Sequence, residues 1–241
     1  MAKHTSNPLD KPKLKSYYEN ARPEVLAVVA KHGLVAPTVV ELGCGAGFAS
    51  RQIKEAVKAT RYIGVESSVA AAEQARKVLD EVHVADVATV APAELGIADG
   101  TIDLLATVDI LEHLYDPWEA LARWAATLKP GGHALVSMPN AQNVKLVTRL
   151  ISGMWTYEEE GLLDSTHLRY FTLEGLISLI TGAGLTVQTM HSIMQPRIDV
   201  AAVQETGNSI TVENVTLSGL TRRQIGGLFA YQYIVIAQKA G

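Results

Sequence analysis

The sequence lacks a second cysteine and a long hydrophobic run. Because Cys44 is the only cysteine, an internal disulfide and a zinc site built from several cysteines are both excluded. A single cysteine also fits a reducing setting. No run approaches the roughly 20 apolar residues of a membrane span, and the polar, lysine-bearing first residues do not resemble a signal peptide. We therefore expect a cytoplasmic protein with no membrane partner.

A basic balance of charge is also lacking. The formal net charge is −4 over 241 residues, and nucleic-acid binding needs a basic face, so no nucleic-acid partner is expected. Hydrophobic residues make up 48% of the chain, which permits a large core and excludes global disorder. Pro8 and Pro12 break regularity near the start. We expect a mobile tail over residues 1–14 and one domain over 15–241, with insertions at about 141–171 and 195–230.

A glycine-rich turn follows the first predicted strand. Residues 38–42 form a short β-branched run typical of a buried strand, and Phe48 begins a segment with apolar residues at helical spacing. Between them, Gly43, Gly45 and Gly47 let the backbone turn sharply and approach a ligand. A dinucleotide fingerprint needs glycines at relative positions 1, 3 and 6, whereas here Phe48 occupies the sixth position. The pattern predicts the opening unit of a nucleotide-type α/β fold.

Acidic residues end the next two predicted strands. Glu66 follows the strand at 61–65 and stands 19 positions after Gly47, where an acidic residue accepts hydrogen bonds from ribose hydroxyls. Asp86 follows the strand at 81–85. Together with the glycine turn, Glu66 indicates a nucleoside ligand. Ser67 and Ser68 are candidate caps of a helix that runs to residue 79.

Three segments resemble a known family. Glu41-Leu42-Gly43-Cys44-Gly45-Ala46-Gly47 resembles motif I of the class I methyltransferases that use S-adenosylmethionine. Residues 109–117 resemble the LEHLxDP block of a branch that acts on small molecules, and residues 163–172 resemble an LDxTHLRFFT block of polysaccharide-pathway methyltransferases. Asp116 and Pro117 also read as the cap and first residue of a helix to residue 128, which stops at 129–132.

The resemblance implies a fold and a cofactor site. The fold is a doubly wound, Rossmann-like α/β sheet of seven strands, with the last strand antiparallel, helices on both faces and lid insertions. The remaining strands are expected at 101–108, 133–138, 185–194 and 231–238, and further helices at 15–32, 141–154 and 172–181. The implied S-adenosylmethionine contacts are Tyr17, Arg22, Glu41, Gly43, Cys44, Gly45, Gly47, Glu66, Ser67, Asp86, Val87, Val108 and Asp109.

Two histidines are candidate catalytic residues. A sulfonium methyl group is already electrophilic, so the main task is to align the acceptor and exclude water. A hydroxyl acceptor also needs a general base, and histidine titrates near neutrality. We favour His167, with Asp164 as its orienting partner, over His113. Packing under the cofactor is the alternative for His113, and pinning of the loop is the alternative for His167 and Arg169.

The acceptor site is predicted from residues of the same loop and one strand end. Arg169 suits an anionic group, while Asn140 either holds the acceptor hydroxyl or ends its strand. The substrate-binding candidates are Asn140, Asp164, Arg169 and Tyr170. No metal site is predicted, because Asp109, Glu112 and Asp164 offer oxygens without a spacing signature.

The favoured function is O-methylation of a small molecule of the sugar or sugar-nucleotide type. Methylation of nitrogen or carbon in another metabolite, an NAD-dependent oxidoreductase and a non-catalytic cofactor-binding module are the alternatives. A homodimer is left open.

Overall fold

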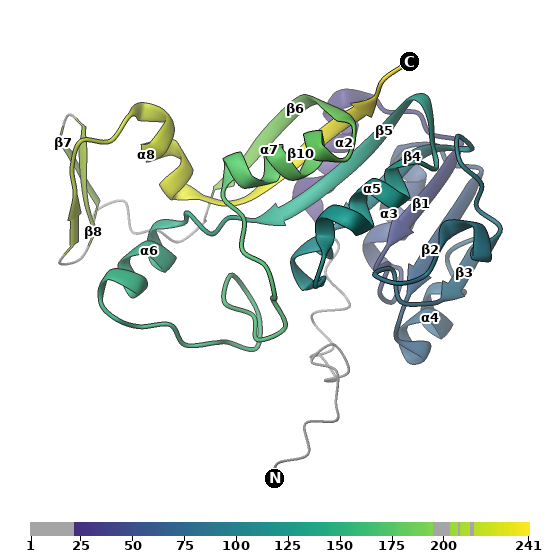
Figure 1. Ribbon diagram of the computed structural model, residues 1–241, viewed down its shortest axis with the longest axis horizontal. Coiled ribbons are helices and arrows are strands. Elements are labelled where there is room, and N and C mark those ends of the chain that lie inside the picture. The colour runs from purple at the N-terminus through teal and green to yellow at the C-terminus, as the bar shows by residue number, and fades with distance from the viewer. Residues whose placement is uncertain (1–21, 195–202, 207, 213–214) are drawn as a thin grey trace, which may run out of the picture.

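The computed structural model describes residues 22–194, 203–206, 208–212 and 215–241. The predicted tail, Tyr17 and the start of the helix expected at 15–32 lie outside the described residues. The main feature is a seven-stranded sheet in the order β3-β2-β1-β4-β5-β10-β6 (Figure 1). Its strands are β1 (Thr38–Leu42), β2 (Arg61–Glu66), β3 (Glu81–Val84), β4 (Ile102–Val108), β5 (Leu128–Pro139), β6 (Leu185–Met194) and β10 (Ala230–Lys239).

The strand directions confirm the expected topology. Strands β1 to β5 pair in parallel, whereas β10 pairs antiparallel with both β5 and β6. The chain moves outward from β1 to β3 and then returns to the other side of β1 as β4. Ligands of open α/β sheets bind at such a reversal, beyond the carboxyl ends of the strands. The doubly wound sheet with an antiparallel last strand is therefore confirmed.

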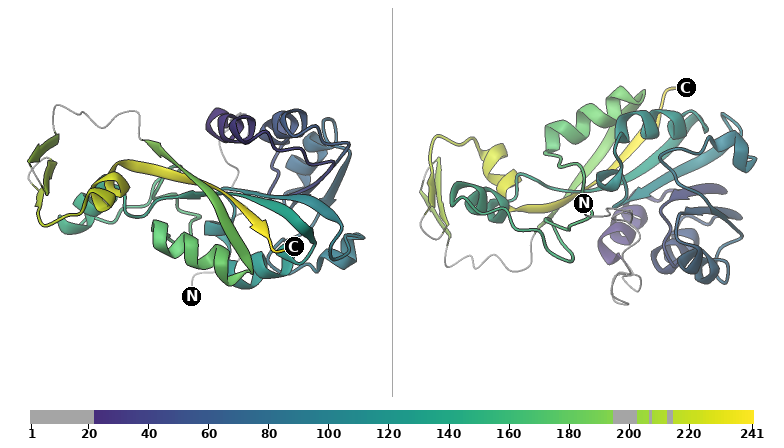
Figure 2. Two further views of the ribbon diagram at one scale, coloured as in Figure 1. Left: turned by 90° about the horizontal axis from the view of Figure 1, so that it is seen from above. Right: turned by 60° about the horizontal axis from the view of Figure 1, so that its bottom comes forward.

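Helices cover both faces of the sheet (Figure 2). Successive strand residues enter opposite cores: Val39 and Leu104 pack with helices of one face, while Val40 and Leu105 pack with those of the other. Because both faces are covered, the central strands β1 and β4 are mostly buried apolar runs, whereas the edge strands β3 and β6 keep partly exposed positions. The first face carries α2 (Pro23–His32), α3 (Phe48–Ala56) and α4 (Val69–Ala75), and the second carries α5 (Pro117–Ala125) and α7 (Leu173–Gly182).

Side-chain caps begin three of these helices where the sequence predicts them. The Asp116 side chain accepts from the Glu119 N–H at 3.0 Å, and the Ser68 hydroxyl accepts from the Ala71 N–H at 3.3 Å. The Thr172 side chain caps α7 in the same way. Each cap satisfies an amide that the first helical turn leaves without a partner.

Several element boundaries differ from the prediction, among them the end of the helix expected to reach residue 128, which lies at Ala125. The helix expected to reach residue 79 ends at Ala75, and the strand expected over 81–85 ends at Val84. The stop predicted at 129–132 is wrong, because β5 already begins at Leu128. Gly131 adopts a φ of +76°, and the register between β4 and β5 shifts after Ile102. The two glycines therefore form an irregularity within the strand and not a loop before it.

The two segments predicted as insertions pack against each other. The first contains α6 (Val144–Ile151), and the second contains a small sheet of β7 (Val203–Thr206), β8 (Ser209–Val212) and β9 (Val215–Leu217), followed by α8 (Arg222–Phe229). Val144, Ile210, Ile225 and Leu228 form a separate small core between them. Figure 1 shows this unit at the end of the molecule remote from β1–β3.

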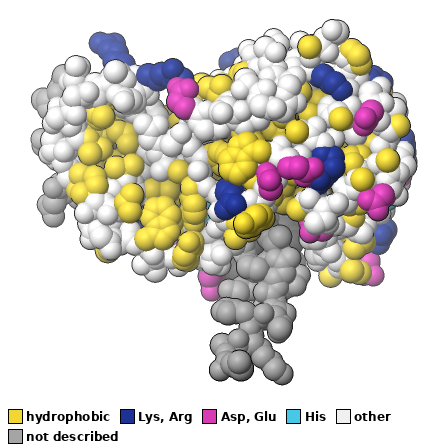
Figure 3. All heavy atoms as spheres, in the orientation of Figure 1, with side chains coloured by type: hydrophobic (Ala, Val, Ile, Leu, Met, Phe, Trp, Pro, Cys, Tyr) yellow, Lys and Arg dark blue, Asp and Glu magenta, His cyan; other side chains and the backbone are white. Residues whose placement is uncertain are grey.

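The surface of this end is partly apolar. Hydrophobic side chains show at the surface on the left of Figure 3, where Figure 1 places α6 and α8. Exposed apolar residues on and after α6 are Leu150, Ile151, Met154, Trp155 and Tyr157. Among the helices of the described residues, none combines the length and the apolar character needed to cross a membrane.

Candidate active site

A first pocket lies beyond the carboxyl ends of β1, β2, β3 and β4. Among the residues predicted to hold the cofactor, those that line it are Arg22, Glu41, Gly43, Cys44, Gly45, Glu66, Ser67, Asp86, Val87, Val108 and Asp109. Gly47 does not line it; a Cβ at this position would meet Val78, in the turn after α4, at 2.7 Å. Gly47 therefore permits close packing between segments. Phe48, the residue at the sixth position of the glycine pattern, is half-exposed and lines the pocket.

The glycine turn packs closely against its neighbours and holds the Glu66 carboxylate. Gly43 adopts a φ of +68°, and a Cβ there would lie 2.7 Å from the Ile110 side chain. The Gly45 N–H donates to Oε2 of Glu66 at 2.9 Å, and the Ser68 N–H donates to Oε1 at 2.8 Å. These bonds hold the half-buried Glu66 carboxylate at the pocket wall, in position to accept from hydroxyls. The turn and the carboxylate fit an adenosyl group.

Burial changes the chemistry of two residues in the turn. Burial raises the pKa of Glu41 from 4.5 to about 7, although the Tyr62 hydroxyl donates to it at 2.8 Å and favours the charged form. Burial also raises the pKa of the Cys44 thiol, followed in size by the effect of the Glu41 charge. Cys44 is therefore not a reactive thiolate, and its sulfur packs where a side chain at Gly64 would otherwise lie.

A second pocket of about 600 Å³ adjoins the first. Arg22, Asp109 and His113 line both pockets, so they mark the junction between them. The residues that line only the second pocket are Glu112, Pro139, Lys145, Glu158, Glu160, Gly161, Asp164, His167, Tyr231 and Gln232. The sequence predicts Asp164 and His167 in an acceptor site, but not Lys145, Glu158, Glu160, Tyr231 or Gln232.

Asp109 organises the junction. Its φ of +51° is unusual for a residue other than glycine, and such strained positions concentrate at functional sites. Its carboxylate pairs with Arg22 at 2.7 Å and accepts from the Ser137 hydroxyl at 2.5 Å and from the Gln232 amide at 2.7 Å. The side chain thus ties the segment before α2 to β5 and β10.

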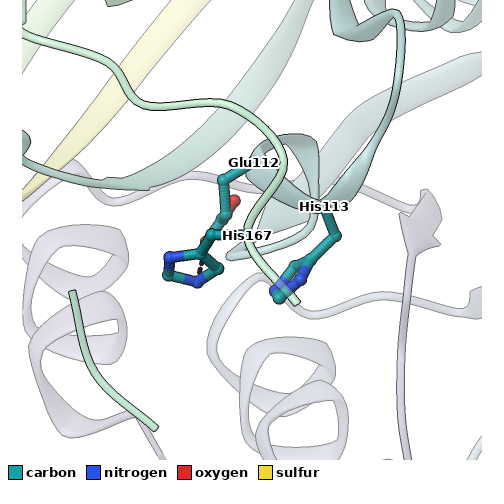
Figure 4. A group of neighbouring side chains, drawn as sticks. All are labelled: Glu112, His113 and His167. Atoms are coloured by element: carbon teal, nitrogen blue, oxygen red, sulfur yellow. Dashed lines mark ion pairs between the residues drawn. The ribbon is translucent and has the colours of Figure 1, made fainter. Parts of the chain in front are cut away.

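The two candidate histidines lie together (Figure 4). Their ring centroids are 4.8 Å apart, and both rings are buried. Nδ1 of His113 lies 3.2 Å from the Thr166 carbonyl oxygen and 3.0 Å from its hydroxyl, which donates to Asp164 at 2.7 Å. Through the Thr166 hydroxyl, the Asp164 side chain supports the orientation of His113. Nδ1 of His167 lies 3.2 Å from the Leu162 carbonyl oxygen.

Glu112, which the sequence offers only as an oxygen donor without a spacing signature, is buried in the lining of the second pocket. It follows β4 in the short helical turn η3 (Leu111–His113), and its side chain points toward His167 (Figure 4). Its carboxylate is 1% exposed. Burial, and next the charge of Asp109, raise its pKa well above the usual range. Its backbone carbonyl accepts from the N–H groups of Leu168 and Arg169, so the loop at 161–171 is fastened to this turn.

The remaining predicted substrate residues lie elsewhere. The Asn140 amide donates to the carbonyls of Gly227 and Ala230 and accepts from the Gln142 N–H, which supports the strand-end alternative. Arg169 lines neither pocket: it donates to the Tyr115 carbonyl at 2.5 Å and lies over the Tyr115 ring. Tyr170 packs against Trp155 and His167, also outside the lining.

Comparison with known proteins agrees with this geometry. A family model described as a methyltransferase domain matches residues 14–190. The chain is 28% identical over 176 residues to trans-aconitate 2-methyltransferase of Variovorax paradoxus, a match that covers 70% of this chain and 66% of the relative. It is 24% identical over 170 residues to ubiquinone biosynthesis O-methyltransferase of Cupriavidus pinatubonensis, covering 67% and 68%.

A solved structure shares the fold. The 1,6-didemethyltoxoflavin-N1-methyltransferase of Burkholderia thailandensis, solved with its substrate and S-adenosylhomocysteine, is similar with a TM-score of 0.58 and 16% identity. The match covers 94% of this chain and 81% of that one. The curated relatives are matched over 30% to 75% of their own length.

Proposed function

The chain belongs to the methyltransferase-domain family and its cofactor is S-adenosylmethionine; on this premise we propose that it methylates an oxygen of a small, polyhydroxylated molecule of the sugar or sugar-nucleotide type. In this proposal the glycine turn and Glu66 hold the cofactor in the first pocket, and the acceptor lies in the second. When bound, the cofactor supplies an electrophilic methyl group. The work of the protein is then to align the acceptor oxygen and exclude water.

The observation that carries the proposal is the junction of the two pockets. Arg22, Asp109 and His113 line both of them, so a ligand in one lies beside a ligand in the other. Both histidines and Glu112 lie at the acceptor side of this junction. Alignment of two bound groups can supply roughly 7–11 kcal/mol of a reaction barrier.

The charges of the second pocket favour a polyol over a polyanion. Its carboxylates are Asp109, Glu112, Glu158, Glu160 and Asp164, whereas Arg22 and Lys145 are the arginine and lysine side chains that line it within the described part of the chain. Arg22 is already paired with Asp109 at 2.7 Å. Carboxylates accept hydrogen bonds from hydroxyl donors, while negative charges inside this pocket would be repelled, so the diphosphate of a sugar nucleotide would lie outside it. The same lining would attract an ammonium group, so an amine acceptor is the second candidate.

In the absence of a bound cation, His167 is the side chain suited to take the hydroxyl proton. The Leu162 carbonyl can only accept a hydrogen bond, so Nδ1 of His167 carries the proton and Nε2 carries the lone pair. His113 is held in the same tautomer by the Thr166 carbonyl. A base near the scissile hydroxyl typically contributes about 10²–10⁴-fold in rate.

Calorimetry and label transfer test the proposal. S-adenosylhomocysteine should bind the wild-type chain with one site, and Glu66→Ala should weaken this binding, whereas exposed Glu73→Ala should not. Transfer of labelled methyl groups should be detected with neutral glycosides or sugar nucleotides and not with trans-aconitate. Absence of S-adenosylhomocysteine binding would reject the cofactor assignment, and labelling of amines alone would replace the hydroxyl acceptor.

Two further expectations remain predictions. A homodimer would be expected to use the exposed apolar residues on and after α6, and its mass in solution can be measured by light scattering. A cytoplasmic location can be tested by fractionation of cells that express the tagged chain.

A further inference from the structure

Three side chains that commonly bind metal ions converge in the second pocket. Glu112 and His113 come from η3, and His167 comes from the loop at 161–171 (Figure 4). One potential ligand atom from each lies within 4.8 Å of the others, and all three residues are buried. No other group of three His, Cys, Asp or Glu residues in the described ranges meets this criterion.

The Glu112 carboxylate is the second, independent observation. Neither of its oxygens has a hydrogen-bond partner among the described residues, although the side chain is almost completely buried. The nearest cationic candidate is Nε2 of His167, which lies 3.9 Å from Oε1 and is beyond hydrogen-bond distance. Buried carboxylates are normally paired or bound to metal. This one is directed at two imidazoles and satisfied by neither.

The histidines present the atoms that a metal needs. Each has Nδ1 directed at a backbone carbonyl, Thr166 for His113 and Leu162 for His167. Such a contact fixes the proton on Nδ1 and leaves the lone pair on Nε2. Metal-binding histidines in proteins usually donate their second ring N–H in this way, which orients the ring and raises its basicity. For His113, the Thr166 hydroxyl and Asp164 extend this support.

We infer that Glu112, His113 and His167 bind a divalent transition-metal ion, with Zn²⁺ as the reference probe, and that this ion holds the acceptor oxygen at the junction of the two pockets. Two imidazoles and one carboxylate suit zinc and its first-row neighbours better than Mg²⁺ or Ca²⁺, which prefer oxygen ligands alone. Ligands about 2.1 Å from a tetrahedral ion lie roughly 3.4 Å apart, so small side-chain rotations close the present spacing. Three protein ligands leave a coordination position open for a substrate.

The role of the ion rests on the proposed function, although its binding does not. A divalent ion lowers the pKa of a coordinated hydroxyl, and the hydroxyl proton passes to a water molecule. An electron pair of the acceptor oxygen forms the bond to the methyl carbon as the carbon–sulfur bond breaks, and the electrons of that bond remain on sulfur as a neutral thioether. His167 is then a ligand and not the general base, because its Nε2 lone pair is used.

The test compares metal and cofactor binding in the same preparations. The full-length chain, stripped with a chelator, is titrated calorimetrically with Zn²⁺, Mn²⁺ and Mg²⁺, and separately with S-adenosylhomocysteine. One equivalent of Zn²⁺ should bind more tightly than Mg²⁺. Glu112→Gln, which keeps the shape of the side chain, and His167→Gln, at a residue that lines only the second pocket, should each weaken Zn²⁺ binding by at least roughly tenfold while S-adenosylhomocysteine still binds.

Matched controls exclude binding at the surface. Nε2 of His191 lies 3.4 Å from Nε2 of His32 on the outside of the sheet, and this pair could bind Zn²⁺ adventitiously. His191→Gln and Glu73→Gln should both retain the single tight site. Co²⁺ in the wild-type chain should show visible bands of nitrogen and oxygen coordination that are altered in Glu112→Gln.

The outcomes separate the two proposals. If S-adenosylhomocysteine binds but Zn²⁺ does not, or if Glu112→Gln and His167→Gln bind Zn²⁺ as the wild type does, the metal site is refuted and the proposed function stands. If Zn²⁺ binds with the expected variant pattern but S-adenosylhomocysteine does not, the metal site stands and the proposed function fails. Should both glutamine variants unfold, absence of the Co²⁺ bands in the wild type would itself refute the site.

Discussion

Replacement of Glu41 by glutamine should stabilise the protein in a pH-dependent way. The Glu41 side chain lies at the end of β1 and is 3% exposed. Burial raises its pKa from 4.5 to about 7, so the folded state holds a proton that the unfolded state releases. Stability should therefore fall as pH rises through this interval. Glutamine cannot ionise and can still accept the hydrogen bond that Tyr62 donates, so Glu41→Gln removes this loss.

The expected size follows from the two pKa values. Below pH 4.5 the carboxyl is protonated in both states and the variant gains little. Between 4.5 and about 7 the wild type loses about 1.4 kcal/mol per pH unit relative to the variant. Above this interval the difference levels off at about 3 kcal/mol, which in a chain of this size corresponds to roughly 6–12 °C in melting temperature.

Thermal unfolding followed by circular dichroism measures this difference. Wild type and Glu41→Gln are compared at about pH 5 and about pH 8. At the lower value the wild type has lost little stability relative to the variant, and at the higher value it has lost the full amount. Glu73→Gln on the exposed side of α4 is the matched control and should follow the wild type at both values. A stability difference of equal size at both pH values would refute the assignment of a raised pKa to Glu41.

Three further substitutions probe the glycine turn, the end of β5 and the core between the sheet and α5. Gly43→Ala places a Cβ 2.7 Å from the Ile110 side chain at a φ of +68°, and calorimetry should show at least a tenfold loss of S-adenosylhomocysteine affinity. Asn140→Ala removes amide bonds to the Gly227 and Ala230 carbonyls and should cost about 1–3 kcal/mol in urea unfolding; unchanged stability with a raised KM would instead favour the substrate role. Trp124→Phe removes the buried indole bond to the Val87 carbonyl at 3.1 Å and should cost about 1–3 kcal/mol by the same measurement, with an unaltered urea midpoint as the contrary result.

The residues of the first pocket could be predicted from the sequence because each is marked by a local sequence pattern. Gly43, Gly45 and Glu66 follow buried strands and Asp86 follows an alternating one, and the ends of parallel strands meet at one edge of the sheet. Contact between these residues therefore follows from the topology alone. The central strands could be recognised in the sequence as apolar runs because helices cover both faces of the sheet.

The residues of the second pocket are brought together by contacts between segments that are distant in the sequence, and no local sequence pattern indicates such contacts. Glu112 and His167 meet only because the loop at 161–171 folds back onto η3, where the Glu112 carbonyl accepts two of its N–H groups. The distance of Arg169 from the pocket depends on the same folding, since its guanidinium donates to the Tyr115 carbonyl. The early start of β5 escaped prediction because two glycines signal a turn more often than a strand irregularity.

The small core shared by the two inserted segments has a consequence for how acceptor choice can be altered. Val144 of the first segment packs in one cluster with Ile210, Ile225 and Leu228 of the second, and both segments adjoin walls of the second pocket, which Lys145 and Tyr231 line. A graft of either segment alone from a homologue would leave mismatched apolar surfaces, whereas exchange of both should preserve their packing. To change the substrate specificity, both segments should therefore be exchanged together, while the glycine turn and Glu66 are kept unchanged.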